Sequence, residues 1–157
     1  MKKLLYLLLL LPLAFMASCS DDDDTPNVEI TVTFENAAMG SDNVMYAVQE
    51  KDYPFKVQSI TVKPLSGKAA GLSMVGYSLD YEPLGVAAVE PFGVNLGSLP
   101  LGNHLLMMNF SILQVDKSIF QSQLQFYFKV VEKASDIPGQ PELGTVTSSF
   151  SLEPKKK

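Results

Sequence analysis

Apolar and polar residues alternate along most of this chain, and a two-residue period is that of a β-strand. In Val28–Phe34 every second residue is apolar, and β-branched residues occur throughout. The same alternation runs through residues 104–112, where His104 shares the apolar side, and through residues 124–130. Successive side chains of a strand point to opposite faces, so each stretch predicts a half-buried strand.

Shorter runs between Gly- and Pro-containing turns predict further strands. They lie at residues 55–64, 74–81, 91–96 and 145–152, with a short edge strand at 45–49 and a short segment at 86–89. The odd spacing of Val57 and Ile60 predicts either a bulge or a later start of the strand, and residues 36–43 and 137–141 are predicted loops. No helical periodicity persists beyond the N-terminal apolar run, so we expect no helices in the folded part. The predicted short strands, about seven to eight in number, indicate an all-β fold, an antiparallel β-sandwich.

The N-terminal residues have the features of an export signal. Two lysines precede an apolar run, Leu4–Met16, which is short for a permanent membrane span but fits the apolar region of a signal peptide. The run ends in Met16-Ala17-Ser18-Cys19, which resembles the lipobox of bacterial lipoproteins, with serine where glycine or alanine is commoner. Cys19 is the only cysteine, so it has no disulfide partner and lipidation accounts for it. We expect residues 1–18 to be removed; the alternative is an ordinary secretory signal cleaved near Ala17.

An acidic run follows the cysteine, and neighbouring carboxylates repel one another too strongly to be buried. Its residues are Ser20, Asp21, Asp22, Asp23 and Asp24. Cys-Ser followed by aspartates resembles the export signal of surface lipoproteins in Bacteroidota, which implies a lipid-anchored protein of the outer membrane, exposed on the cell surface. The predicted organisation is therefore a lipidated tether over 19–27, a folded domain over 28–153 and a basic tail over 154–157.

The charge balance narrows the classes of partner. All basic residues are lysines, and without Lys2 and Lys3 ten lysines face 17 acidic residues, a net charge near −7. An acidic chain without arginine argues against nucleic acid, phosphate and anionic lipid headgroups as ligands. The chain has no tryptophan, which weakens a stacking platform for sugars, although tyrosine and phenylalanine can also stack.

The middle of the chain resembles the bacterial immunoglobulin-like modules of surface and secreted proteins. The matching residues are Val75-x-Tyr77-x-Leu79-Asp80, Leu84-Gly85, Pro91-Phe92 and Leu99-x-x-Gly102-x-His104-x-Leu106. The resemblance implies an immunoglobulin-like sandwich, and it carries no activity, because such modules serve as spacers, adhesive domains and carbohydrate-binding accessories. Tyr81 stands where the family often has glycine, which predicts a wider turn after Asp80.

Few residues could carry chemistry. His104 is the only histidine, and it follows a turn at Pro100–Gly102, where an aromatic residue of immunoglobulin-like folds hydrogen-bonds back to the loop it leaves. This favours a structural role. No second histidine or free cysteine accompanies it as a metal ligand, and packing explains the methionines better than soft-metal binding does. A Ser-His-Asp set would have to include His104. We therefore expect no enzyme activity, no metal and no cofactor.

Two further patterns leave alternatives open. Asp80 and Glu82 lie two positions apart and could form a carboxylate pair or a calcium loop, but a hairpin turn fits the sequence better. Leu105, Met107 and Leu113 are apolar on the side of their strand that should face solvent. Either another segment covers them, or they form an exposed patch for a partner.

These observations predict a non-catalytic, lipid-anchored surface module that presents loops or a sheet face to a protein or a glycan. Tyr53, Tyr81 and Tyr127 are its candidate ligand contacts if they line a concave face. The alternative is a structural or anchor subunit of an outer-membrane complex or fimbria that pairs through an exposed strand edge. An unpaired, uncharged edge strand would favour this alternative.

Overall fold

The computed structural model describes residues 24–154. The predicted signal peptide, Cys19, Ser20, the acidic residues 21–23 and the tail residues 155–157 lie outside the described residues. The described part contains β1 (Val28–Met39), β2 (Met45–Val48), β3 (Phe55–Pro64), β4 (Ala70–Leu79), β5 (Glu82–Ala87), β6 (Val94–Gly97), β7 (Gly102–Gln114), β8 (Phe120–Val131), the 3₁₀ turn η2 (Ala134–Asp136) and β9 (Gly144–Leu152). No helix among these residues is long and apolar enough to cross a membrane.

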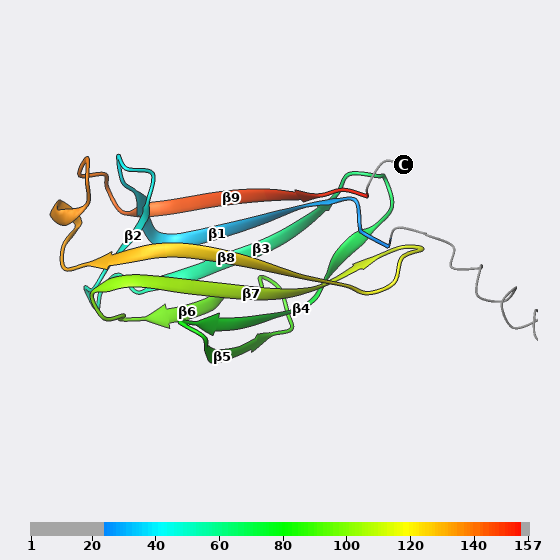
Figure 1. Cartoon of the computed structure of the whole chain (residues 1–157), viewed down its shortest axis with the longest axis horizontal. Coiled ribbons are helices and arrows are strands. Elements are labelled where there is room, and N and C mark those ends of the chain that lie inside the picture. The colour runs from blue at the N-terminus through cyan, green and yellow to red at the C-terminus, as the bar shows by residue number, and fades with distance from the viewer. Residues whose placement is uncertain (1–23, 155–157) are drawn as a thin grey trace, which may run out of the picture.

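The strands form a sandwich of two layers (Figure 1). One layer contains β5, β4, β7 and β8 in this order, and the other contains β9, β1, β3 and β6. β2 pairs with β1 on one side and with β8 on the other, so it joins the layers into one hydrogen-bonded sheet. The predicted immunoglobulin-like sandwich is confirmed, because β1, β3 and β6 face β4, β7 and β8 as in that fold. An additional strand, β9, extends the β1 layer.

The core lies between the layers and is rich in phenylalanine. The ring of Phe34 on β1 meets Phe126 on β8 at 4.9 Å between centroids, and Phe55 on β3 meets Phe128 on β8 at 4.7 Å. Phe150 extends this contact to β9. The residues predicted to face the core from β7 are buried: His104, Leu106, Met108, Phe110 and Ile112. The alternation along β7 and β8 therefore identified the inner faces correctly.

Two predictions about the first strands are wrong. The strand that begins at Val28 continues to Met39, through part of the predicted loop. Asn36 has a positive φ of 58°, and the register shifts beside it, so that Ala37 and Ala38 pair with β2. β2 is not an edge strand, because it lies buried between β1 and β8 and runs parallel to β8. The sandwich is therefore not purely antiparallel.

The predicted bulge in β3 is confirmed. Thr33 of β1 pairs with Ser59, whereas its neighbour Phe34 pairs with Val57. Gln58 is therefore the extra residue. The bulge explains why Val57 and Ile60 both face the core although an odd number of positions separates them.

The strand predicted to open at Pro91 begins only at Val94. The residues before it form a turn that packs against the bulge of β3. A Cβ atom on Gly93 would lie 2.7 Å from the carbonyl oxygen of Val57, so the backbones approach closely enough to require glycine. In the same turn the carbonyl of Phe92 accepts a hydrogen bond from the buried Tyr77 hydroxyl.

The turn after Asp80 is narrower than predicted. Leu79 pairs with Glu82, which leaves only Asp80 and Tyr81 in the loop, and their φ angles are 50° and 72°. Two positive φ angles in a two-residue hairpin define a type I′ turn, whose second position favours glycine. The hairpin interpretation of this segment is confirmed, and the prediction of a wider turn is wrong. β5 accordingly begins at Glu82, earlier than the predicted segment at 86–89.

Replacing Tyr81 with glycine should stabilise the fold. A left-handed backbone costs a non-glycine residue about 1 kcal/mol, and glycine avoids this cost. We expect Tyr81→Gly to raise the free energy of unfolding in urea by about 0.5–1 kcal/mol. Tyr53→Gly is the matched control, because Tyr53 is also exposed and has no positive φ. If Tyr81→Gly lowered the free energy of unfolding as much as the control does, the positive φ of Tyr81 would not be a source of strain.

Candidate functional surface on β4, β7 and β8

His104 is buried near the start of β7 and is tied to two neighbouring turns. Its ring is buried and stacks on Phe128 with 5.4 Å between centroids. Nε2 lies 2.8 Å from the carbonyl oxygen of Pro100 and donates to it, since a carbonyl can only accept. Nδ1 lies 2.7 Å from Oδ2 of Asp80. The predicted hydrogen bond back to the loop that the strand leaves is confirmed.

Asp80 joins the β4–β5 turn to β7. Its Oδ1 accepts a hydrogen bond of 2.8 Å from the N–H of Leu105, and its own N–H donates to the carbonyl of Leu105 at 2.9 Å. Burial raises the pKa of Asp80, but hydrogen bonds from Leu105 and His104, and the charge of His104, outweigh burial and hold the pKa below its ordinary value. Asp80 is therefore an ionised anchor for the turn that carries Tyr81.

A row of uncharged polar side chains crosses the outer face of β7 and β8, and we call it the amide row. Gln123 donates from Nε2 to Oδ1 of Asn109 at 2.9 Å, and Gln125 donates from Nε2 to Oε1 of Gln123 at 3.1 Å. Gln121 and Ser111 form two further contacts of 2.9 and 3.1 Å. The glutamines and Asn109 are exposed, so these amides keep donors and acceptors available to a ligand.

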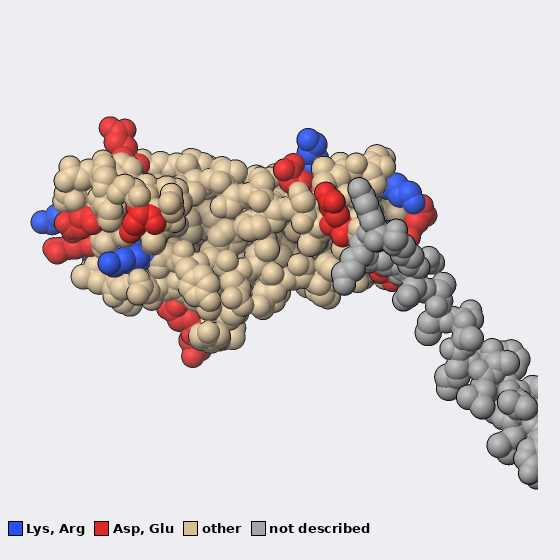
Figure 2. All heavy atoms as spheres, turned by 45° about the horizontal axis from the view of Figure 1, so that its top comes forward, with Lys and Arg blue, Asp and Glu red and all other residues tan. Residues whose placement is uncertain are grey.

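The surface around the amide row carries almost no charge. β4 and β7 contain no Asp, Glu, Lys or Arg, and β8 contains only Lys129 of these. Met74 and Val86 add exposed apolar surface on the same outer face, since Met74 pairs with Ser111, and Val86 pairs with Gly76, whose other partner is Asn109. Figure 2 shows that, on the face it draws, most charged side chains lie towards the two ends of the sandwich, with a further acidic group at the lower edge. A neutral ligand on this surface would meet few charges, of which Lys129 is exposed on β8 and Glu82 is exposed beside the β4–β5 turn.

The structure brings two of the three candidate tyrosines to the same height along the strands, beside Leu105 of β7. Tyr127 is 71 % exposed on β8 and pairs with Leu105 across the strands. Tyr81 is 76 % exposed in the β4–β5 turn, whose Asp80 is hydrogen-bonded to the same Leu105. The two tyrosines therefore flank β7, about two strand spacings or 10 Å apart. Tyr53 lies in the β2–β3 loop, so it does not belong to this row.

The predicted apolar patch on the outer side of β7 is not continuous. Leu105 is buried beside the β4–β5 turn, Met107 is half-buried, and Leu113 is 43 % exposed. The patch is therefore covered by a neighbouring turn at Leu105 and exposed to solvent at Leu113.

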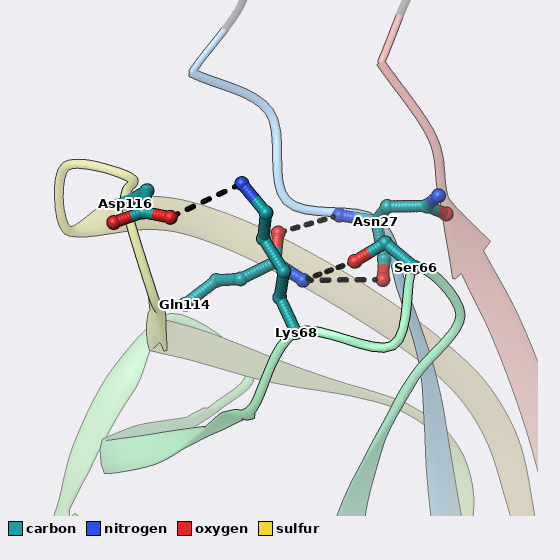
Figure 3. A network of polar contacts seen from close by, with 5 residues as sticks. All are labelled: Asn27, Ser66, Lys68, Gln114 and Asp116. Atoms are coloured by element: carbon teal, nitrogen blue, oxygen red, sulfur yellow. Dashed lines mark hydrogen bonds and ion pairs between the residues drawn. The ribbon is translucent and has the colours of Figure 1, made fainter.

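A polar network fixes the point at which the tether enters the sandwich (Figure 3). The buried Gln114, at the end of β7, accepts from the N–H of Asn27 at 3.1 Å and donates to the hydroxyl of Ser66 at 3.2 Å. Lys68 and Asp116 form an ion pair of 3.2 Å beside it. This end lies opposite the His104 end, because β7 runs from His104 to Gln114. The sequence gives no sign of this network, because its partners come from distant parts of the chain.

Two hollows of the surface lie away from the candidate tyrosines. One of about 380 Å³ is lined by Ala69–Leu72 and Leu113–Val115, and one of about 230 Å³ lies between β3 and β4 beside Pro91. Neither of these two hollows is lined by a candidate tyrosine or by His104. Within residues 24–154 no group of three His, Cys, Asp or Glu side chains is placed to hold a metal ion.

Comparison with known proteins adds no family to this geometry. No protein-family model matches the chain, and no curated protein matches it in sequence.

Replacing Asp80 with asparagine should make the fold less sensitive to acid. Because the folded pKa of Asp80 is lowered, its contribution to stability is present above about pH 4, the pKa of an unfolded aspartate, and is lost as the pH falls through the folded value. In urea titrations the stability advantage of the wild type over Asp80→Asn should therefore shrink below pH 4. Asp52→Asn, at an exposed loop residue, is the control. An advantage that does not change with pH would refute this role of the carboxylate.

Proposed function

We propose that this protein is a non-catalytic, lipid-anchored binding module of the bacterial cell surface that presents the outer face of β4, β7 and β8 to a neutral glycan. The observation that carries the proposal is the amide row on a sparsely charged face, with Tyr81 and Tyr127 beyond the end of the row that lies at Gln125. Amide groups can donate to and accept from sugar hydroxyls, and exposed tyrosine rings can stack on the apolar face of a sugar.

The anchoring part of the proposal rests on Cys19 and on the acidic residues after it. A lipidated cysteine with several acyl chains would hold the protein stably at the outer membrane, and residues 19–27 could span up to about 30 Å when extended. The β4–β5 turn and Tyr127 lie on the half of the sandwich away from Asn27. Anchoring would therefore direct the tyrosines away from the membrane, and it would raise the effective concentration of the module at the envelope.

The proposed absence of catalysis is supported by the state of His104. Both of its ring nitrogens are engaged, one with Asp80 and one with Pro100, and the ring is buried. The only histidine of the chain is therefore committed to the fold and cannot also act as a base towards a substrate.

A second candidate function is assembly, as a structural or anchor subunit of an outer-membrane complex or fimbria. One observation favours it: among residues 24–154, β9 pairs only with β1, and it contains no charged residue. Such an edge can accept another strand by main-chain hydrogen bonding.

Substitutions on the outer face should weaken glycan binding. Gln123→Ala and Tyr127→Ala should each lower the affinity of the purified protein for a neutral glycan by about tenfold, since each removes a contact worth about 1–1.5 kcal/mol. Gln58→Ala is the control, because Gln58 is exposed on the opposite layer. The measurement is binding to a panel of host and dietary glycans. If no neutral glycan binds and cross-linking on intact cells recovers a protein, the ligand is that protein.

Cys19→Ala should release the protein from membranes and abolish fatty-acid labelling, because the thiol that carries the lipid is gone. In the same cells, replacing Asp21–Asp24 with alanine should keep the label but reduce the fraction that external protease removes. Lipid labelling that persists in Cys19→Ala would refute the anchor. Equal protease access in both lipidated forms would make the acidic run a spacer only.

A further inference from the structure

β9 presents a long strand edge that nothing protects. It pairs with β1 along its whole length and has no partner on its other side among the described residues. The other terminal strands are guarded, because β6 has only four residues and β5 carries Glu82 and Pro83. β9 contains neither charge nor proline. Native proteins usually block their edges with such features, so β9 is suited to pair with another strand.

The registers of β1 and β3 determine which backbone groups of β9 point outward. Ile60 donates its N–H to Pro91, away from β1, and Ile60 pairs with Val32. Val32 must therefore direct its own backbone groups towards β9, where its partner is Ser148. Ser148 points its backbone back to β1, and the residues on either side of it point outward. The outward groups belong to Thr145, Thr147, Ser149 and Ser151.

The side chains of β9 are nearly symmetric about Ser148. Val146 and Phe150 lie two positions before and after it, and both are half-buried on the inner face. The exposed positions on the other face are threonine before the centre and serine after it, at 145 and 147 against 149 and 151. A contact between identical surfaces requires this kind of self-complementarity, because each residue meets its symmetry-related counterpart.

We propose that the partner of β9 is a second copy of this chain, bound by antiparallel pairing of the two β9 strands about a two-fold axis at Ser148. In this register Thr147 lies opposite Ser149, Thr145 opposite Ser151 and Val146 opposite Phe150. All outward backbone groups then face one another, which gives about eight interchain hydrogen bonds. The half-buried Val146 and Phe150 gain cover, and hydroxyl pairs line the outer side.

The dimer rests on the assembly alternative given above and does not depend on the glycan-binding face. That face belongs to the other layer of the sandwich, so it stays accessible in the dimer. A monomer that still binds a neutral glycan would overturn the dimer alone. A dimer without glycan binding would overturn the glycan proposal alone.

Cysteine cross-linking on intact cells tests the register with the full chain. In the proposed dimer the two Ser148 residues face each other as a non-hydrogen-bonded pair, close enough for a disulfide. Ser148→Cys should therefore give a band of twice the mass on non-reducing gels. Thr145→Cys is the control, since two copies of residue 145 lie about 20 Å apart in this register. Equal cross-linking of both variants, or none in either, overturns the proposal.

A charge exchange tests the same pairing without cysteine. Thr147→Lys with Ser149→Lys places like charges opposite each other and should weaken the dimer about tenfold or more. Thr147→Lys with Ser149→Glu places opposite charges there and should restore it. Both positions are exposed, so neither variant alters the core. The readout is the mass of the full-length lipoprotein extracted in mild detergent. A monomeric wild type, or loss of the dimer in both variants, overturns the proposal.

Discussion

Apolar burial between two layers is the constraint on which the rest of this structure depends. The sandwich contains no cysteine, so no disulfide can hold the layers together. The phenylalanines of β1, β3, β8 and β9 meet across the interface instead, with centroids 4.7 to 5.5 Å apart. Aromatic pairs of this kind add about 0.5–1.5 kcal/mol each beyond the area that they bury. Because the inner faces supply the stability, the outer face of β7 and β8 is free to consist of exposed amides and tyrosine.

The polar interactions of the sandwich have a different task, which is to fix the ends of strands. Gln114 holds the entering chain at one end, and His104 with Asp80 holds a loop and a turn at the other. Three contacts of Asp80 over-determine the β4–β5 turn, and this is the condition under which strained backbone persists. The contacts of Asp80 therefore hold Tyr81 at its unfavourable φ angle. Backbone strain at an exposed tyrosine fits the proposal that this residue serves contact with a ligand and not the stability of the fold.

The sequence predicted those parts of the fold in which one strand face is buried and the other is wet. β3 begins and ends at the predicted residues 55 and 64, its bulge was visible in the spacing of Val57 and Ile60, and the role of His104 followed from its parity. β2 lies at the residues where the sequence predicts a strand, but the prediction of an edge strand is wrong, because a strand buried on both faces shows no alternation that marks its neighbours. The turn at Tyr81 was misjudged because hydrogen bonds of its neighbour outweigh the preference for glycine.

The candidate site was predictable only in part, for a related reason. The sequence marks Gln123, Gln125 and Tyr127 as outward-facing, since they alternate with core residues of the same strand. It does not reveal that Tyr81 lies at the level of Tyr127, or that β9 has one partner, because both facts depend on pairing between distant segments. Local periodicity gives the direction of a side chain, whereas its neighbours come from topology.

The pairing of Val28 with Leu152 determines how the sandwich responds to mechanical load. The chain enters and leaves the sandwich at the same end, on adjacent antiparallel strands (Figure 1). Tension between the two termini would open the β1–β9 ladder one hydrogen bond at a time, as a zipper opens. Tension between the tether and a ligand on the distal half of β8 acts instead along the strands, where many hydrogen bonds share the load. An anchored module of this design would therefore unfold under a smaller force applied between its two termini than under a force applied between the tether and a bound ligand.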